Sequence, residues 1–277
     1  MNNQKIDLNS VCDRMMQAAA TAGRYISAEA RTFTPSMVRS KAFHDLVSHV
    51  DTEAEKIITD ALHDTVPGAA FFTEEETSRR ETGDYTWYID PLDGTTNFVH
   101  QVRPYSVSIA LCQMEEPVAG VVLDITHNEM FTAVKGGGTK LNGNRVYVSE
   151  TGETDSSIVA TGFPVRRFER LTEHLACLEY FIRNSRGVRR MGSAAVDLAN
   201  VACGRFDAFW EYGLSAWDVK AGVLLVREAG GVASDFKGNR VGITGEEIVA
   251  SNRVISEEVI NIVNRFFNSK NSGTDGR

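Results

Sequence analysis

The stretch WYIDPLDGTTNFVH, residues 87–100, carries more structural information than any other part of this 277-residue chain. Its first residues are aromatic or apolar and predict a buried strand over Trp87–Ile89. Because Pro91 has no backbone N–H to give to a sheet, we predict that this strand ends at Asp90. The side chain of Asp90 would then point into a cleft from the tip of the strand.

The residues after Pro91 add a second acid and an anion site. Asp93 follows across a turn that Gly94 permits, and two carboxylates on one tight turn repel each other unless a cation lies between them. A hard divalent cation such as Mg²⁺ prefers oxygen ligands of this kind. Thr95 and Thr96 predict the start of a short helix, whose free N–H groups would hold a phosphate. Metal ligands beside an anion site are what phosphoryl transfer requires.

The rest of the chain alternates between helical periodicity and short apolar runs, which predicts a mixed α and β protein built in layers. The predicted helices span residues 6–30, 51–63, 167–184, 193–203, 215–229 and 256–267. The predicted strands span residues 69–72, 86–89, 106–113, 118–124, 129–134, 157–161, 188–191, 205–211, 232–235 and 248–250. The last ten residues, 268–277, are polar, and we predict that they are disordered.

Composition narrows the class of protein. With 42% hydrophobic and 24% charged residues, the chain is neither disordered nor fibrous. Its formal net charge of −8 argues against nucleic acid as a partner. No apolar run approaches the roughly 20 residues of a membrane span, and the N-terminus lacks an apolar signal core. The four cysteines are widely spaced in apolar runs and predict buried free thiols. We therefore expect a soluble, cytoplasmic protein without a membrane partner.

Two motifs, more than a hundred residues apart, resemble the signatures of the inositol monophosphatase family. WYIDPLDGTTNFVH is similar to the pattern WxxDPxDGTTNFxH, and WDVKAGVLLVREAGG at 217–231 is similar to WDxxAGxxxxxEAGG. The flanking segments resemble the family as well: DLVSHVDTEAEK at 45–56, FFTEEE at 71–76 and MGSAAVDLANVACGRFDAFWE at 191–211. The resemblance covers roughly residues 10–265, and two matching motifs in the right order are far more specific than one.

The resemblance implies a fold and an assembly. The expected fold is a layered αβαβα sandwich of the inositol monophosphatase and fructose-1,6-bisphosphatase type. Residues 1–150 would form an α+β half around a largely antiparallel sheet and carry most of the metal ligands. Residues 151–267 would form an α/β half that carries Asp218 and the substrate contacts, with the metal site between the two halves. A homodimer is also implied.

The resemblance assigns roles to matching residues. The expected Mg²⁺ ligands are Glu74, Asp90, the carbonyl of Leu92, Asp93 and Asp218. The expected catalytic residues are Glu74, Asp51 and Thr95. Asp51 and Thr95 would orient the attacking water. The expected contacts to phosphate and to the substrate's hydroxyl groups are Gly94, Thr95, Gly192, Ser193, Ala194 and Glu211. Lys41 is the nearest counterpart of a lysine that the family keeps in a mobile loop.

The implied reaction is direct in-line hydrolysis of a small phosphate monoester, with Mg²⁺ stabilising the leaving oxygen and with inhibition by lithium. Myo-inositol 1-phosphate is the first choice of substrate. The alternatives are histidinol phosphate, 3′-phosphoadenosine 5′-phosphate and fructose 1,6-bisphosphate. The 3′-phosphoadenosine branch of the family tends toward a Lys-Glu pair where this chain has Thr96-Asn97, which argues against 3′-phosphoadenosine 5′-phosphate. A different class of function is a catalytically silent binding or regulatory protein on the same fold.

Each acid also has an ordinary structural explanation. Asp90 could cap a turn, Asp218 could favour the start of a helix, and Glu74 could belong to a solvated run of acids. All of these explanations would have to be true at once, although the segments that carry the acids match one family in the same order along the chain. We therefore favour the metal site. The chain contains no HxxxH, GxSxG or GxxxxGK[ST] pattern, which argues against zinc, serine-hydrolase and NTPase chemistry.

Overall fold

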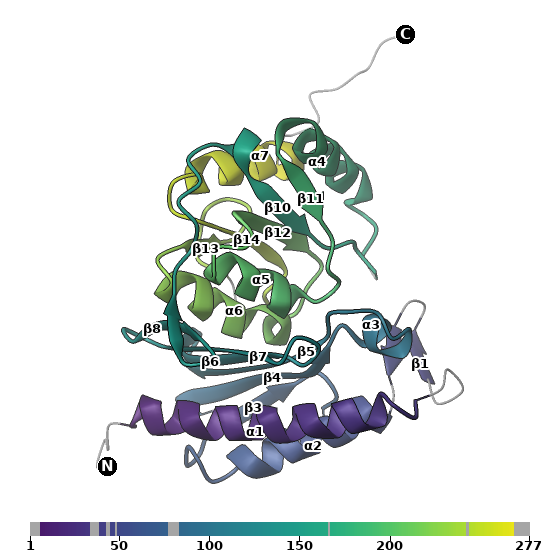
Figure 1. The fold of residues 1–277 in the computed structure, drawn as a ribbon, viewed down its shortest axis with the longest axis vertical. Helices are drawn as coiled ribbons and strands as arrows, with labels where there is room; N and C mark the ends of the chain where they lie inside the picture. The colour runs from purple at the N-terminus through teal and green to yellow at the C-terminus, as the bar shows by residue number, and fades with distance from the viewer. Residues whose placement is uncertain are drawn as a thin grey trace.

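The structure, a computed structural model, describes residues 6–33, 39–42, 45–47, 49–76, 83–165, 167–241 and 244–268. Two sheets and three pairs of helices alternate in five layers, and Figure 1 shows them stacked from the α1–α2 pair to the α4–α7 pair. This arrangement is the layered αβαβα sandwich that we expected. The helices are α1 (Leu8–Glu29), α2 (His49–Leu62), α3 (Thr95–Val99), α4 (Leu171–Asn184), α5 (Ala194–Ala202), α6 (Ala216–Glu228) and α7 (Ser256–Asn268).

The strands fall into a large sheet, a smaller sheet and a short hairpin. The hairpin is β1 (Arg39–Ala42) and β2 (Asp45–Val47). The large sheet holds β3 (Ala70–Thr73), β4 (Tyr85–Asp93), β5 (Ser106–Gln113), β6 (Glu116–Asp124), β7 (Glu129–Val134), β8 (Gly138–Leu141) and β9 (Asn144–Val146). The smaller sheet holds β10 (Ile158–Thr161), β11 (Gly187–Arg189), β12 (Ala208–Tyr212), β13 (Val232–Ser234) and β14 (Glu247–Ser251).

The large sheet runs in chain order from β3 to β9 and is antiparallel except for the parallel pair β3–β4. Helices α1 and α2 cover one face, where Met15, Ile58 and Trp87 are fully buried. Helices α5 and α6 cover the other face, where Leu198 and Leu225 are fully buried. Because both faces are covered, strand β5 is buried along almost its whole length.

The smaller sheet has the order β11-β10-β12-β14-β13. Strand β10 is parallel to β11 and β12, and β14 is antiparallel to β12 and β13. A third core lies on the side of α4 and α7, where Phe181, Trp210 and Phe236 have no exposed surface. Helices α5 and α6 thus lie between the two sheets (Figure 1), which places their N-terminal ends beside β4.

The structure corrects the prediction that the strand after Trp87 ends at Asp90. Strand β4 continues through Pro91 to Asp93, and its pairing with β5 is irregular between Asp90 and Asp93. Proline is tolerated there because an interrupted ladder needs no N–H at that position. Asp90 therefore lies at a bulge inside a strand, opposite Ser108, and not at a strand tip.

Other differences are smaller. The strands β8 and β9, which flank turns at 135–137 and 142–143, were not predicted. The hairpin of β1 and β2 was not predicted either. Three cysteines are buried and free as expected, whereas Cys203 is only partly buried.

Some predictions remain open. The predicted disordered segment lies outside the described residues, except for Asn268, which ends α7. Lys41 lies on β1, but its side chain is outside the described part of the structure. The division into halves at residue 150 stays a prediction. None of the helices in the described ranges combines the length and the apolar character needed to cross a bilayer.

Candidate active site

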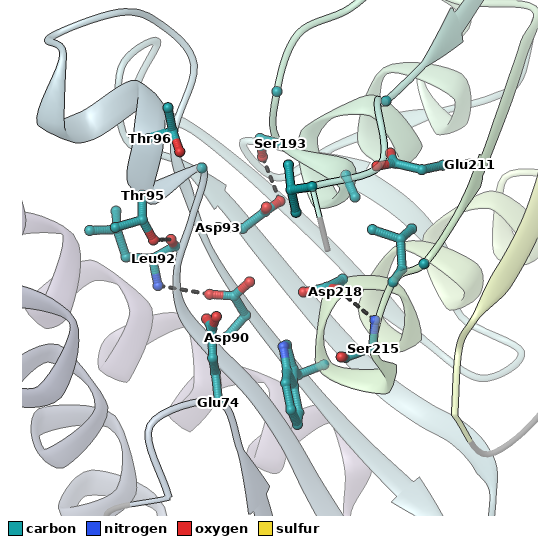
Figure 2. A pocket seen from close by; sticks show the side chains of 18 of the residues that line it. Glu74, Asp90, Leu92, Asp93, Thr95, Thr96, Ser193, Glu211, Ser215 and Asp218 are labelled. Carbon is teal, nitrogen blue, oxygen red and sulfur yellow. Dashed lines mark hydrogen bonds between the residues drawn. The ribbon is translucent and has the colours of Figure 1, made fainter. Parts of the chain in front are cut away.

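A pocket opens between the two sheets, where the bulge of β4 faces the N-terminal ends of α5 and α6. Figure 2 shows acidic side chains around it that come from both parts of the chain. The structure brings together almost every predicted site residue: Glu74, Asp90, Leu92, Asp93, Gly94, Thr95, Gly192, Ser193, Ala194, Glu211 and Asp218 all line this pocket. Asp51 does not line it and lies behind Thr95.

Glu74 and Asp90 are neighbours because of the parallel pair β3–β4. The pairing of Thr73 with Ile89 continues one residue further, where the Glu74 N–H donates to the carbonyl of Ile89 at 3.2 Å. Asp90 is only 2% exposed, and its Oδ1 accepts from the N–H of Leu92 at 2.9 Å. Burial, followed by the nearby charges of Glu74 and Asp93, raises the pKa of Asp90 well above its ordinary value.

Asp93 is tied to the start of α5. Its Oδ2 accepts from the hydroxyl of Ser193 at 2.6 Å and from the N–H of Ala195 at 2.8 Å. Burial raises the pKa of Asp93, and these hydrogen bonds oppose that effect because they favour the charged form. The same Ser193 hydroxyl also caps α5 by accepting from the N–H of Val196 at 3.3 Å. Ser193, predicted as a substrate contact, therefore holds Asp93 in place in this structure.

Thr95 connects the pocket to the buried acid behind it. Its hydroxyl lies within hydrogen-bonding distance of Asp51 Oδ1 and of the Leu92 carbonyl, at 3.1 Å in each case. Asp51 is 1% exposed and belongs to the first turn of α2. Gly94 precedes α3 with φ of 94°, a left-handed conformation that favours glycine, and so turns the chain from β4 into the helix.

Asp218 and Glu211 form the far wall. Asp218 lies in the first turn of α6, where its Oδ2 accepts from the N–H of Ser215 at 2.7 Å as part of a capping box. Glu211 lies on β12 against Gly162, where an added Cβ would come within 2.1 Å of the Glu211 carboxyl group. Burial, and then the charges of Asp218 and Asp93, raise the pKa of Glu211 well above its ordinary value.

This donor set fits a hard divalent cation. Four carboxylates and the Leu92 carbonyl offer only oxygen, the ligand type of Mg²⁺, Ca²⁺ and Mn²⁺. Within the described ranges no three His, Cys, Asp or Glu side chains already form a metal-binding group. Asp93 is bonded to the start of α5, and Asp218 to the start of its own helix. A cation would offset the mutual repulsion that raises the pKa of Asp90.

The pocket also contains residues that the sequence analysis missed. Arg190 is the cation among its described lining residues, and its guanidinium carbon lies 5.6 Å from the ring centre of Phe163. Asp197, which does not line the pocket, is buried one turn into α5, and no described residue bonds to its Oδ1. Arg190 stands two residues before the Gly192-Ser193-Ala194 segment, and this position was the one signal that could have identified it.

Fold and site together define a class: layered αβαβα proteins whose two sheets enclose a pocket of carboxylates beside the start of a short helix. Residues 7–266 match the Inositol monophosphatase family. The chain belongs to the inositol monophosphatase family.

Relatives and solved structures agree with this assignment. "Nus factor SuhB" of Pseudomonas aeruginosa is 42% identical over 242 residues, 86% of this chain and 89% of that protein. "Inositol-1-monophosphatase" of Mesorhizobium japonicum is 40% identical over 252 residues, 91% and 95% of the two chains. The crystal structure of extragenic suppressor protein suhB from Bartonella henselae has a TM-score of 0.85 at 37% identity, covering 91% of this chain and 97% of that one.

Inositol monophosphatase from Anabaena has a TM-score of 0.81 at 32% identity, covering 93% of this chain and 96% of its own. Family and structural neighbours together support phosphatase activity on a small phosphate monoester, and the family is in general metal-dependent.

Proposed function

We propose that this protein is a Mg²⁺-dependent phosphomonoesterase that hydrolyses myo-inositol 1-phosphate, or a similar small polyol phosphate, to the alcohol and phosphate. The observation that carries the proposal is the convergence of Glu74, Asp90, Asp93 and Asp218 on one pocket, beside the backbone of Gly94 and Thr95. Mg²⁺ held by these acids and by the Leu92 carbonyl would neutralise the phosphate and stabilise the leaving oxygen.

The chain's own residues would divide the remaining work. The backbone N–H groups of Gly94 and Thr95 would hold phosphate oxygens at the start of α3. The hydroxyl of Thr95, fixed by its contact with Asp51, would orient the attacking water, and Asp51 would accept the proton that the water loses. Glu211 and the segment Gly192–Ala194 would bind the hydroxyl groups of the substrate, since they line the opposite wall.

The choice of substrate rests on a relative's name and on the pocket. The Mesorhizobium japonicum protein, 40% identical, is named an inositol-1-monophosphatase. The wall formed by Glu211 offers a hydrogen-bond acceptor for the hydroxyl groups of a polyol. We also propose the homodimer and the cytoplasmic location that the sequence analysis expected.

The test is phosphate release from four substrates, with and without Mg²⁺ and with added lithium. The panel is myo-inositol 1-phosphate, histidinol phosphate, 3′-phosphoadenosine 5′-phosphate and fructose 1,6-bisphosphate. We expect Mg²⁺-dependent, lithium-sensitive release that is fastest from myo-inositol 1-phosphate. A strong preference for another compound would keep the metal site and replace the substrate, whereas no release from any of them would remove the enzymatic function.

A second candidate is a binding or regulatory role without turnover. Several relatives, among them the 42% identical Pseudomonas aeruginosa protein, are named Nus factors. The presence of all four expected acids in the pocket favours the enzyme. A purified protein that binds Mg²⁺ but releases no phosphate from the panel would favour the second candidate.

A further inference from the structure

Helix α2 buries two acids on its core-facing side, one turn apart. Asp51 is 1% exposed and Glu55 has no exposed surface. Asp51 contacts Thr95, as described above, but the proposed mechanism gives Glu55 no part. A buried carboxylate is costly unless several donors satisfy it, so its partners indicate what it does.

Two donors to Glu55 lie on either side of one residue. The hydroxyl of Thr73 donates to its Oε1 at 2.8 Å, and the N–H of Glu75 donates to its Oε2 at 2.7 Å. Glu74, one of the four acids of the pocket, is the residue between these two donors. The Glu74 N–H is itself fixed to the carbonyl of Ile89 at 3.2 Å. The backbone that carries Glu74 is therefore held from both sides.

We infer that Glu55 is a positioning residue, which fixes the backbone around Glu74 so that the Glu74 carboxylate is ready for the divalent cation. The inference rests on the proposed metal-dependent function and deepens it. Helix α2 then serves the pocket twice. Asp51 holds Thr95 on the phosphate side, and Glu55 holds Glu74 on the metal side.

A role of Glu55 in stability alone explains its contacts with Thr73 and Glu75 less well. The neighbours of Glu55 on the buried face of α2 include Ala54 and Ile58, so an apolar side chain at position 55 would suit the core. Replacing buried polar groups by apolar ones is often neutral or stabilising, which leaves stability a weak reason for a carboxylate here. Partners that orient metal ligands, by contrast, typically change metal affinity about 10- to 100-fold when they are mutated.

The test compares three variants of the full-length protein. Glu55→Gln keeps the shape of the side chain but removes its charge: the amide oxygen can still accept from the Glu75 N–H, while the Thr73 hydroxyl has to reverse and accept from the new NH₂ group, so both hydrogen bonds lose their charged acceptor and weaken. Thr73→Val removes one bond from the other side. Thr59→Val is the matched control, because Thr59 is 6% exposed on the same helix and its hydroxyl donates only to Glu55 and Lys56 carbonyls within α2.

The readout is the dissociation constant of Mg²⁺ by calorimetric titration, which does not depend on turnover, together with kcat and KM at saturating Mg²⁺. We expect Glu55→Gln to weaken Mg²⁺ binding about 10-fold or more and Thr73→Val to weaken it about threefold. We expect Thr59→Val to bind Mg²⁺ as the native protein does. The lost kcat of Glu55→Gln should largely return at saturating Mg²⁺.

An unchanged Mg²⁺ affinity in Glu55→Gln, or an equal loss in Thr59→Val, would overturn the inference. If Glu55→Gln does not fold, unchanged Mg²⁺ affinity in Thr73→Val overturns it instead. A native protein that binds Mg²⁺ but hydrolyses nothing would end the proposed function and leave the positioning role intact. A native protein that takes up no Mg²⁺ would end both.

Discussion

Glu211 reaches the pocket because Gly162, on the neighbouring chain segment, has no side chain. An added methyl group would lie within 2.1 Å of the Glu211 carboxyl atoms, a distance that no structure tolerates. The end of a glutamate side chain moves easily, so Gly162→Ala should displace Glu211 with little loss of stability. We expect KM for the phosphate substrate to rise about 10-fold, the value of one hydrogen bond to a charged group, with Mg²⁺ affinity unchanged.

Steady-state kinetics and Mg²⁺ titration together check this prediction. Gly152→Ala is the control, because a Cβ at Gly152 meets no atom within 4 Å. An unaltered KM in Gly162→Ala would show that Glu211 does not touch the substrate.

His174 predicts how the protein responds to acid. Its ring is 1% exposed, packs against Trp210 and Tyr212, and has no described hydrogen-bond partner at either nitrogen. Burial lowers its pKa from 6.5 to about 4, so the folded state excludes a proton that the unfolded state binds below pH 6.5. Stability from this residue is therefore lost as the pH falls from 6.5 towards 4, by about 2 kcal/mol between pH 7 and pH 5.

Urea unfolding of the native protein and of His174→Phe at both pH values measures this loss. The variant should lose about 2 kcal/mol less than the native protein between pH 7 and pH 5. Equal losses in the two proteins would mean that His174 takes up a proton in the folded state.

For single residues, the sequence predicted the acids of the pocket but not the residues that bond to them. The resemblance identified Asp90, Asp93 and Asp218, because these residues lie inside specific motifs. It did not reveal that Ser193 bonds to Asp93 or that Arg190 lines the pocket. The Ser193–Asp93 bond joins residues a hundred positions apart, and no local pattern encodes it.

Among the elements, the short helix α3 is bonded to the segment before α5 through the side chain of Asn97. Asn97 is buried, and its amide donates to the carbonyls of Pro104 at 2.7 Å and Met191 at 2.9 Å. Asn97→Ala would leave both carbonyls without this donor and should lower the free energy of unfolding by about 2 kcal/mol. Phosphate hydrolysis should fall as well, since α3 and the Gly192 segment form two walls of the pocket.

Chemical denaturation and turnover are measured on the same preparation. Asn184→Ala is the control, because the Asn184 amide bonds only to the Tyr180 carbonyl within its own helix. A loss as small as in this control would mean that other contacts hold α3 in place.

Long elements could be predicted from the sequence, and short or irregular ones could not. Helix α1 shows a strong 3.6-residue period, and its predicted and observed limits differ by two residues at most. Strand β9 has three residues and no buried position, so it leaves no alternating pattern. Strand β4 passes through Pro91 because a bulge removes the need for a hydrogen bond there, and only its pairing with β5 reveals the bulge.

For the whole molecule, the alternation of helical and strand patterns predicted a protein of mixed layers, and the family resemblance predicted the order of those layers. Hydrophobic patterns say which residues are buried but not which sheet faces which helices. The pocket depends on that order, since it joins β4 to α5 and α6 across the interface between the layers. Such a site could be predicted from the family motifs that carry its residues, but not from the helix and strand patterns of the separate segments.

The intact protein should gain stability from Mg²⁺. A cation that binds only the folded state at 100 times its dissociation constant adds about 2.7 kcal/mol. For a chain of this size this corresponds to a rise in Tm of about 5–10 °C. Differential scanning calorimetry with MgCl₂, and with KCl at equal ionic strength as the control, measures the rise; an equal response to both salts would exclude a specific cation site.

If the acids of the pocket serve a metal-dependent hydrolysis, removing the charge of one of them should stop turnover and spare the fold. Asp93→Asn keeps the size of the side chain and an oxygen for Ser193 and Ala195, so the fold should persist with an unchanged Tm in the absence of Mg²⁺. We expect its Mg²⁺-dependent release of phosphate from myo-inositol 1-phosphate to fall about 100-fold or more relative to the native protein. Near-native release by a folded Asp93→Asn protein would mean that the acids of the pocket do not serve a metal-dependent hydrolysis.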